Sequence, residues 1–472
     1  MANITKKAPV FDVEVGVAEG LSVHGGLVAL DALARQYGLW DKLRAIRGLD
    51  PRKDTSHGFS PEVLVAQLVF SLCSGGAGLS DAERLGRDKT IAPLLGISRG
   101  ADASTLGEWL RGQSEENVAA LDGVVRGFVA WVLERARPER VRRDGVLEVF
   151  FDDTQIEVHG RYFEGAKINY NGDLALSWQT FWTGPFMTAC RFGPASGDQG
   201  EEVGEHLPAV MELSRPLWEK AAQAGEAHFY ADSGSSAGKY LRIIDGENWG
   251  WSVSYNKWTT VPERLALAVP DGRWTAEREA VGRQGQAVLE RYGWVRHQPG
   301  EDCDRALDFA VVRWRDKDGL PLHRHAFVAG RAGPTARAHD PQAAAELFAR
   351  HRLKGARERA FSELLSDLDL HHPPCQSLAA NRMFYSIGML AYDLLVAFRV
   401  LCMDGTSQEM RARSLIRHLM TTPLKLVRHA HRTRARLLCP LNWLRWWQMF
   451  IRDMFPTRKR GRQPKSGVPP SG

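Results

Sequence analysis

One apolar, strand-like run that ends on an acidic residue constrains the fold of this chain more than any other stretch. The run HFYA at 228–231 leads into Asp232, and small residues then form a turn before a helix-like segment that starts near Ala237. A carboxylate at the carboxyl end of a strand lies where α/β folds place their reactive groups. The same side chain could instead cap the following helix. The rest of the chain has to decide between these two interpretations.

A second strand-like run, at 147–151, leads directly into Asp152 and Asp153. Further strand-like stretches follow, and a helix at 205–224 precedes the strand that ends at Asp232, which is an order typical of a mixed α/β sheet. Glu358 lies inside a later helix, expected at 341–368. Carboxylates on neighbouring strands and a facing helix can converge on divalent metal ions, and Mg²⁺ prefers such oxygen ligands. Each acid taken alone fits a helix cap or a solvated surface charge equally well.

Composition and motifs exclude several other classes. The chain has 472 residues, of which 44% are apolar and 25% charged, as in ordinary globular proteins. It lacks an apolar run long enough for a membrane span and a signal-peptide core, so we expect a cytoplasmic protein without a membrane partner. Six cysteines occur without a CxxC pair, which argues against a cysteine-rich zinc site. Phosphate-loop, dinucleotide-binding and nucleophile-elbow motifs are also missing from the sequence.

Positive charge is concentrated at the end of the chain. Residues 411–472 contain 15 Lys and Arg but one acidic residue, whereas residues 1–410 contain 47 basic and 55 acidic residues. Such asymmetry indicates a basic arm that meets a polyanion, most simply nucleic acid, although a solvated tail has the same composition. The residues alone therefore favour a metal-dependent, nuclease-like enzyme.

Several motifs resemble those of a known family. DDTQIE at 152–157, with EGA at 164–166 and YNG at 170–172, resembles the first-aspartate block of bacterial DDE insertion-sequence transposases, in particular DDE group 1 of the insertion-sequence 1380 type. ADSG at 231–234 is similar to the second-aspartate block, and KGARE at 354–358 resembles the glutamate helix. Shorter likenesses occur at 87–88, 104–106, 191–193, 363–364, 380–381 and 390–394. The resemblance covers roughly residues 25–400, with the motifs in the right order.

This resemblance implies an α/β fold, with an RNase-H-like catalytic core interrupted by a β-rich insertion. The domains we expect are a helical N-terminal DNA-binding domain, the first part of the core, the β-rich insertion, the second part of the core, and a basic helical tail with a disordered end. Their ranges are 1–140, 141–246, 247–334, 335–405 and 406–472. Short helices with tight turns in the first range are typical of helix-turn-helix domains and equally of other helical bundles.

The resemblance also implies a chemistry. Asp152, Asp232 and Glu358 would hold two Mg²⁺ ions, with Mn²⁺ as an alternative. The implied reaction is phosphodiester hydrolysis at transposon ends, followed by attack of the freed 3′-OH on target DNA. The implied partners are double-stranded DNA, as terminal inverted repeats and as target, and a second copy of the chain in a homodimer on DNA. The expected location is the bacterial nucleoid in the cytoplasm.

Two features leave alternatives open. The family's Asp-x-Thr spacing favours Asp152, but Asp153 faces the opposite side of a regular strand, and only one of the two can point inward. The family's Tyr-x2-Arg-x3-Glu-x6-Lys pattern is met here by His351, Lys354, Glu358 and Leu365, so the glutamate alone is retained. We expect DNA contacts from His351 and Lys354, and from four basic residues of the tail, Arg458, Lys459, Arg460 and Arg462. The alternative functions are a catalytically decayed DNA-binding protein acting on the same ends, or a metal-dependent DNA nuclease.

Overall fold

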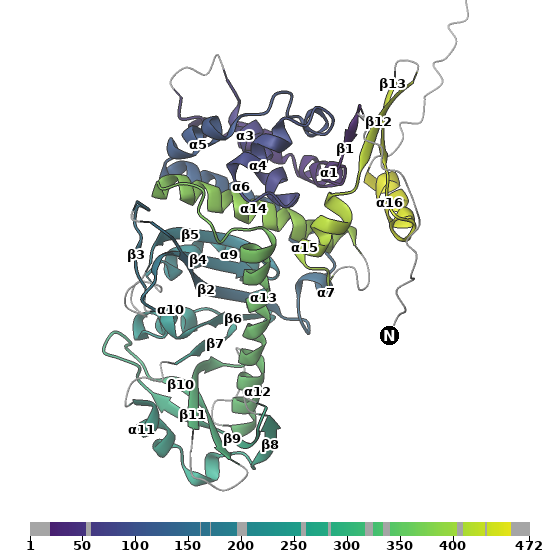
Figure 1. Ribbon diagram of the computed structural model, residues 1–472. Helices are drawn as coiled ribbons and strands as arrows, with labels where there is room; N and C mark the ends of the chain where they lie inside the picture. Colours follow the sequence, from purple (N-terminus) through teal and green to yellow (C-terminus); the bar gives the residue numbers. More distant parts are fainter. Residues whose placement is uncertain are drawn as a thin grey trace, which may run out of the picture.

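The computed structural model shows an elongated molecule, with helices at one end, a sheet across the middle and a β-rich part at the other end (Figure 1). The structure describes residues 19–454 apart from 53–57, 161, 170, 196–204, 256–260, 282–284, 317–323, 334–339, 404–408 and 430–431. The expected disordered end at 455–472 lies outside the described residues.

A mixed sheet forms the centre of the molecule. Its core strands are β2 (Leu147–Glu157), β4 (Leu174–Thr183), β5 (Phe186–Pro194), β6 (Ala227–Ala231) and β7 (Gly250–Ser254). Their order is β5-β4-β2-β6-β7, in which β6 runs parallel to β2 and to β7, and β4 runs antiparallel to β2 and β5. The short strand β3 (Lys167–Ile168) also pairs with β4. The first residues of β2 are mostly apolar because the strand is buried on both faces: Val149 lies in the core on one side of the sheet and Phe150 in the core on the other.

The β-rich segment extends this same sheet. Strands β8 (Arg278–Val281), β9 (Ala287–His297), β10 (Leu307–Asp316) and β11 (Arg324–Arg331) pair antiparallel with one another, and β11 pairs with β7. Since β7 is parallel to β6, it is part of the central sheet, and the added strands begin after Ser254 rather than at the expected residue 247. Helix α11 (Val261–Ala268) belongs to this segment, and helix α12 (Pro341–Arg352), which follows it, packs against β9 and β10.

Helices cover both faces of the central sheet. Helices α9 (Leu207–Gln223) and α10 (Gly238–Gly246) share a core with one face. Helices α13 (Ala356–Ser362) and α14 (Leu378–Cys402) pack on the other. An 18-residue window of α14 is apolar enough to cross a membrane, but 89% of that window is buried inside the molecule. The prediction of a buried core helix at 378–400 is therefore confirmed.

The N-terminal helices pack against α14 rather than forming a core of their own. They are α1 (Leu27–Tyr37), α2 (Leu39–Arg44), α3 (Pro61–Cys73), α4 (Leu79–Gly86), α5 (Ala103–Arg111), α6 (Glu115–Leu133) and α7 (Pro138–Val141). Side-chain caps fix two of the helix starts, because Asp102 accepts from the backbone N–H of Thr105 and Ser114 from that of Asn117.

The C-terminal region differs from the helical tail that we expected. Helix α15 (Ala412–Leu415) continues into a π-helical turn, and a β-hairpin of β12 (Leu424–His429) and β13 (Arg432–Leu437) then precedes helix α16 (Leu441–Met454). Strand β1 (Leu21–Ser22) pairs with β12, so the two ends of the described chain meet in one small sheet. The prediction of a purely helical tail is wrong at 424–437, where apolar and basic residues roughly alternate with the period of a strand.

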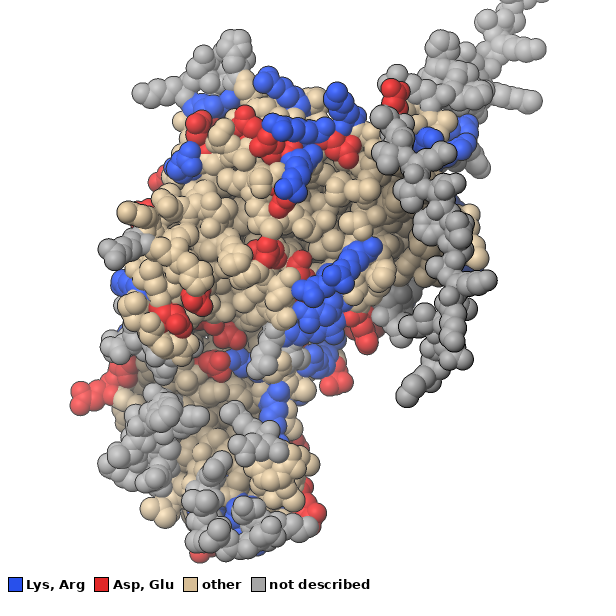
Figure 2. All heavy atoms as spheres, in the orientation of Figure 1, with Lys and Arg blue, Asp and Glu red and all other residues tan. Residues whose placement is uncertain are grey.

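Basic side chains are unevenly distributed over the surface. Figure 2 shows Lys and Arg side chains gathered over the part of this face where Figure 1 places α7, α13 and α15. This region includes α13, the helix that contains Glu358, and therefore lies close to the candidate site.

Candidate active site

Two aspartates lie side by side where the parallel pairing of β2 with β6 ends, Asp152 within β2 and Asp232 directly after β6. Phe151 on β2 is in register with Ala231 on β6, so Asp152 and Asp232 are the next residues along the two strands. Adjacent strands are about 4.8 Å apart, which brings the two carboxylates within reach of a common cation. Asp232 makes no side-chain hydrogen bond as a cap to the short helical turn that follows it. The helix-cap interpretation of Asp232 is therefore wrong.

The two acids of the Asp152–Asp153 pair face opposite sides of the sheet. Trp182 on β4 lies opposite Phe150, so its ring shares a face with the even-numbered residues of β2, including Asp152. Phe361 of α13 packs edge-on against Trp182, with ring centroids 5.9 Å apart. Helix α13 thus lies over the face that carries Asp152.

Asp153 lies on the face covered by α9 and α10, away from α13. Its carboxylate accepts hydrogen bonds from Ser177 Oγ on β4 and, at 2.6 Å, from Gln155 Nε2 on its own strand. Burial raises the pKa of Asp153, and these two bonds oppose the rise. Both carboxylate oxygens of Asp153 are thus hydrogen-bonded within the sheet, which is a structural role.

Lys354 connects the carboxylates of Asp152 and Asp232. It lies in the short 3-10 turn between α12 and α13. Its Nζ is 3.5 Å from Asp152 Oδ2 and forms a closer ion pair with Asp232 Oδ2. The Lys354 side chain is 12% exposed and that of Asp152 19%, whereas that of Asp232 is 60% exposed. The ammonium is therefore a largely buried counter-ion of the two aspartates, and its expected contact with DNA stays a prediction.

The environment of Asp152 favours a nearby cation. Burial raises the pKa of Asp152 to about 6, the Lys354 ammonium opposes this rise, and the neighbouring Asp232 carboxylate adds to it. A buried carboxylate with a raised pKa gains free energy from any positive charge placed beside it. Two adjacent carboxylates, one of them partly open to solvent, also form a donor set that suits Mg²⁺. The residues present thus fit a divalent metal ion.

The third expected carboxylate lies on the helix above this pair. Glu358 is in α13, one helical turn after Lys354, but its side chain lies outside the described part of the structure. Among the side chains that the structure does describe, three or more His, Cys, Asp or Glu residues never cluster closely enough to hold a metal ion. The geometry therefore places two carboxylates together and puts the backbone of the third residue on the facing helix.

His351, which we expected to contact DNA, is hydrogen-bonded to the central sheet. Its Nδ1 lies 3.0 Å from Ser252 Oγ and its Nε2 lies 2.8 Å from Ser254 Oγ, both on β7. Ser252 Oγ also lies 3.0 Å from Nε2 of the buried His228. Burial, together with the nearby Lys354 ammonium, lowers the pKa of His351 to about 4. A neutral imidazole with both nitrogens engaged fixes the end of α12 on the sheet and does not present a charge to DNA.

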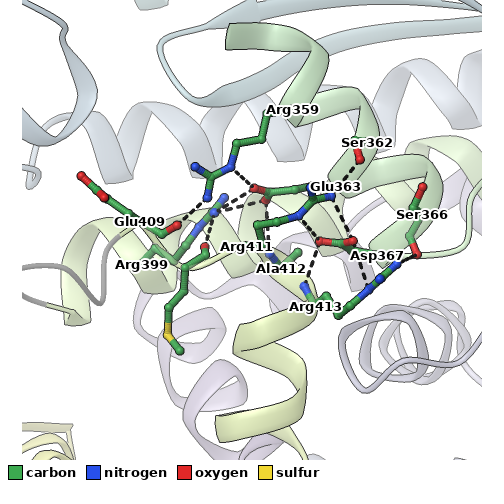
Figure 3. Close-up of polar contacts among 11 residues, drawn as sticks. Arg359, Ser362, Glu363, Ser366, Asp367, Arg399, Glu409, Arg411, Ala412 and Arg413 are labelled. Carbon is green, nitrogen blue, oxygen red and sulfur yellow. Dashed lines mark hydrogen bonds and ion pairs between the residues drawn. The ribbon is translucent and has the colours of Figure 1, made fainter. Parts of the chain in front are cut away.

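A cluster of carboxylates and arginines continues along the same helical segment, and sequence reasoning missed it (Figure 3). Glu363 and Asp367 lie in the π-helical turn that follows α13, and their side chains are 3% and 1% exposed. Together they contact Arg359, Arg399, Arg411 and Arg413. One sequence signal could have indicated part of this cluster. Arg359, Glu363 and Asp367 are four residues apart, a spacing that places charged side chains on one face of a helix.

Two further expectations concern DNA contacts. Leu365, which stands where the family pattern has a lysine, packs partly buried against the main core. The four basic residues expected to contact DNA from the tail, Arg458, Lys459, Arg460 and Arg462, lie outside the described residues.

Comparison with known proteins bears on this geometry. Residues 14–443, nearly the whole chain, match the family described as transposase DDE domain group 1. Among solved structures, the chain is similar to the piggyBac transposase in a cryo-EM structure of its synaptic complex with hairpin DNA, with 11% identity and a TM-score of 0.41 over 84% of this chain and 79% of that chain. A search of the curated proteins finds no match. With the family match extending over strands, insertion and helices alike, the chain belongs to the DDE transposases of group 1.

Proposed function

We propose that this protein is the transposase of a bacterial insertion sequence of the 1380 type. It would cut phosphodiester bonds at the ends of its element in a Mg²⁺-dependent reaction and join the freed 3′-OH ends to target DNA. The observation that carries the proposal is the pairing of Asp152 with Asp232 through Lys354, beneath the helix that carries Glu358.

The strand arrangement supports an RNase-H-like catalytic core. Three antiparallel strands, β5, β4 and β2, are followed by the parallel strands β6 and β7, and helices cover both faces. Asp152 lies within β2, at the point where its pairing with β6 ends, and so lies beside Asp232 at the carboxyl end of β6. The fold therefore supplies a fixed platform for the two carboxylates.

Each residue of the site has a separate task. Asp152, Asp232 and Glu358 would hold the metal ions, and enzymes of this family use divalent metals. Two such ions stabilise charge on the attacking and the leaving oxygen of a phosphodiester. Asp152 is fixed by its strand and by a hydrogen bond of 3.0 Å from the backbone N–H of Asp153 to Oδ1. In the absence of metal, Lys354 keeps the two aspartates together, and His351 anchors the turn that carries Lys354.

The partners follow from the reaction. Double-stranded DNA would bind as terminal inverted repeats and as target, and two copies of the chain would act together on the two ends as a homodimer. The protein would work at the nucleoid in the bacterial cytoplasm. The basic region over α7, α13 and α15 in Figure 2, together with the concentration of Lys and Arg after residue 411, supports a DNA partner.

A plasmid excision assay tests this proposal. The reading frame would be placed with its own flanking genomic DNA between two reporter halves, and excised circles and new insertions would be counted by sequencing. Mg²⁺-dependent excision that ends at short inverted repeats supports a transposase. Cleavage that ignores those ends would indicate a nuclease, and sequence-specific binding of the ends without any cleavage would indicate a DNA-binding protein that has lost catalysis.

A further inference from the structure

The cluster in Figure 3 contains twice as many arginines as the buried carboxylates need. Glu363 pairs with Arg399, at 3.1 Å, and with Arg359, at 3.2 Å. It also accepts from the backbone N–H of Ala412, at 3.3 Å. A buried carboxylate needs one well-placed cation and satisfied oxygens to be stable in the protein interior. One arginine of this pair therefore exceeds that requirement.

The same duplication occurs one turn further on. Asp367 accepts two hydrogen bonds from Arg411, from Nε at 3.1 Å and from Nη2 at 3.2 Å, which is the strong bidentate geometry. It also pairs with Arg413, whose Nε is 3.4 Å away, and accepts from the Arg413 backbone N–H at 3.1 Å. Four guanidinium groups on two carboxylates leave the cluster with an excess of two positive charges.

The duplicated arginines differ in exposure. Arg399 is an inner partner, with a side chain that is 12% exposed, and it also donates to the backbone carbonyl of Met410. Arg411 is 40% exposed, and Arg359 and Arg413 are the outer partners, 49% and 50% exposed. The outer guanidiniums are held in place by the carboxylates and still reach solvent. Glu409, which accepts from Arg359 through its backbone carbonyl, directs its own carboxylate away from the cluster (Figure 3).

The position of the cluster links it to the candidate site. Arg359 follows Glu358 directly in α13, and Glu363 and Asp367 lie in the π-helical turn that continues the same helical segment. The basic surface over α13 and α15 in Figure 2 covers the same part of the molecule.

We propose that Arg359 and Arg413, braced by Glu363 and Asp367, form a docking site for backbone phosphates of the DNA strand that enters the Asp152–Asp232 centre. This inference rests on the proposed function, because it supposes DNA at that centre. A preorganised guanidinium loses little conformational entropy when it binds a phosphate, and its planar fork suits the phosphate oxygens. The contacts would fix the strand's position without reading its sequence.

The test is the salt dependence of DNA binding by the full chain. A fluorescein-labelled 30-base-pair duplex of arbitrary sequence would be titrated with protein at several salt concentrations, in EDTA so that no cleavage occurs. In the double variant Arg359→Gln/Arg413→Gln, each carboxylate keeps one arginine, Glu363 with Arg399 and Asp367 with Arg411. Since each phosphate contact contributes about 0.9 to the slope of log K against log salt, we expect the slope to fall by about 1.8.

Two further variants make the result decisive. Arg359→Lys/Arg413→Lys keeps both charges and should keep the wild-type slope. The control Arg215→Gln/Arg315→Gln also removes two ion-paired, part-exposed arginines, on α9 and β10, and should leave the slope unchanged. An unchanged slope in Arg359→Gln/Arg413→Gln, or an equal fall in the control, would overturn the proposal.

The outcome is separable from that of the excision assay. If the wild-type protein excises its element while the slope is the same in the glutamine variant, the docking site alone is refuted. If the slope falls as expected but the wild-type protein never cuts DNA, the docking site stands and the catalytic proposal fails.

Discussion

Replacing Lys354 by methionine tests the role of its ammonium as a built-in counter-ion. The substitution keeps a long, unbranched side chain but removes the charge that lies 3.5 Å from Asp152 Oδ2 and closer still to Asp232. At an effective dielectric constant of about 20, one such contact is worth about 5 kcal/mol of attraction. The exposure of Asp232 and the relief of the desolvation of Lys354 reduce this figure, so we expect a net loss of about 2–3 kcal/mol in metal-free protein.

Divalent metal should compensate for the lost ammonium. In saturating Mg²⁺, the cation occupies the space between the same carboxylates, so the stability difference between Lys354→Met and wild type should shrink below about 1 kcal/mol. The variant should also reach half-maximal stabilisation at a lower Mg²⁺ concentration, because no lysine competes. The observable is the urea unfolding free energy, followed by tryptophan fluorescence in EDTA and in a Mg²⁺ series.

The control is Lys239→Met, which removes an exposed lysine on the helix after Asp232 and should have the same small effect in both buffers. If Lys354→Met lost equal stability with and without Mg²⁺, the ammonium and the metal would not share a position, and the reasoning would be refuted.

Three other outcomes are expected. Burial raises the pKa of Asp393 well above its usual value, so its folded form keeps a proton that the unfolded form releases above about pH 4. The contribution of Asp393 to stability therefore falls as pH rises, and the stability of Asp393→Asn relative to wild type should rise by up to about 1.4 kcal/mol per pH unit in urea melts. The contribution of His351, whose pKa is lowered to about 4, has the opposite sign and falls as pH decreases from 6.5 to 4, so the stability of His351→Gln relative to wild type should rise as pH decreases over that range in thermal unfolding. Glu363→Gln should cost about 3 kcal/mol, seen as a lower urea midpoint, because it leaves Arg399 largely buried beside a neutral amide.

The sequence predicts the central pair of carboxylates well, and for a physical reason. Asp232 and the Asp152–Asp153 pair each follow an apolar run, and the two runs pair in parallel, so the acids that come next lie side by side. The prediction that the Asp152–Asp153 pair ends its strand is wrong, because β2 continues to Glu157 along β4. Strand periodicity also states correctly that the two adjacent aspartates face opposite sides. It cannot state which side carries the helix, because that depends on the packing of Phe361 against Trp182, which are 179 positions apart in the chain.

Other features depend on contacts that no local pattern encodes. Lys354 lies 122 positions after Asp232, and its role as counter-ion appears only when the turn after α12 is placed over the sheet. The arginine cluster joins the end of α13 to the start of α15, so Glu363 alone resembles any solvated acid on a helix.

The hairpin at 424–437 was misinterpreted because its basic residues resemble a solvated helical tail. One of its strands is stabilised by β1, which comes from the opposite end of the chain. His351 was expected to contact DNA because of its position in the family's Tyr-x2-Arg-x3-Glu-x6-Lys pattern. Its partners in the structure are the hydroxyls of Ser252 and Ser254, on a strand about 100 positions earlier, which no local pattern encodes.

The most direct test of the account compares two neighbouring aspartates. Asp152→Asn and Asp153→Asn each remove one charge from the same strand, but Asp152 alone faces Asp232 and the helix of Glu358. We expect Asp152→Asn to lower the rate of Mg²⁺-dependent cleavage at the element's ends by about 10³-fold, equivalent to about 4 kcal/mol in the barrier. Asp153→Asn should remain within about tenfold of wild type. Full cleavage by Asp152→Asn, or its loss in Asp153→Asn with folding intact, would contradict the account.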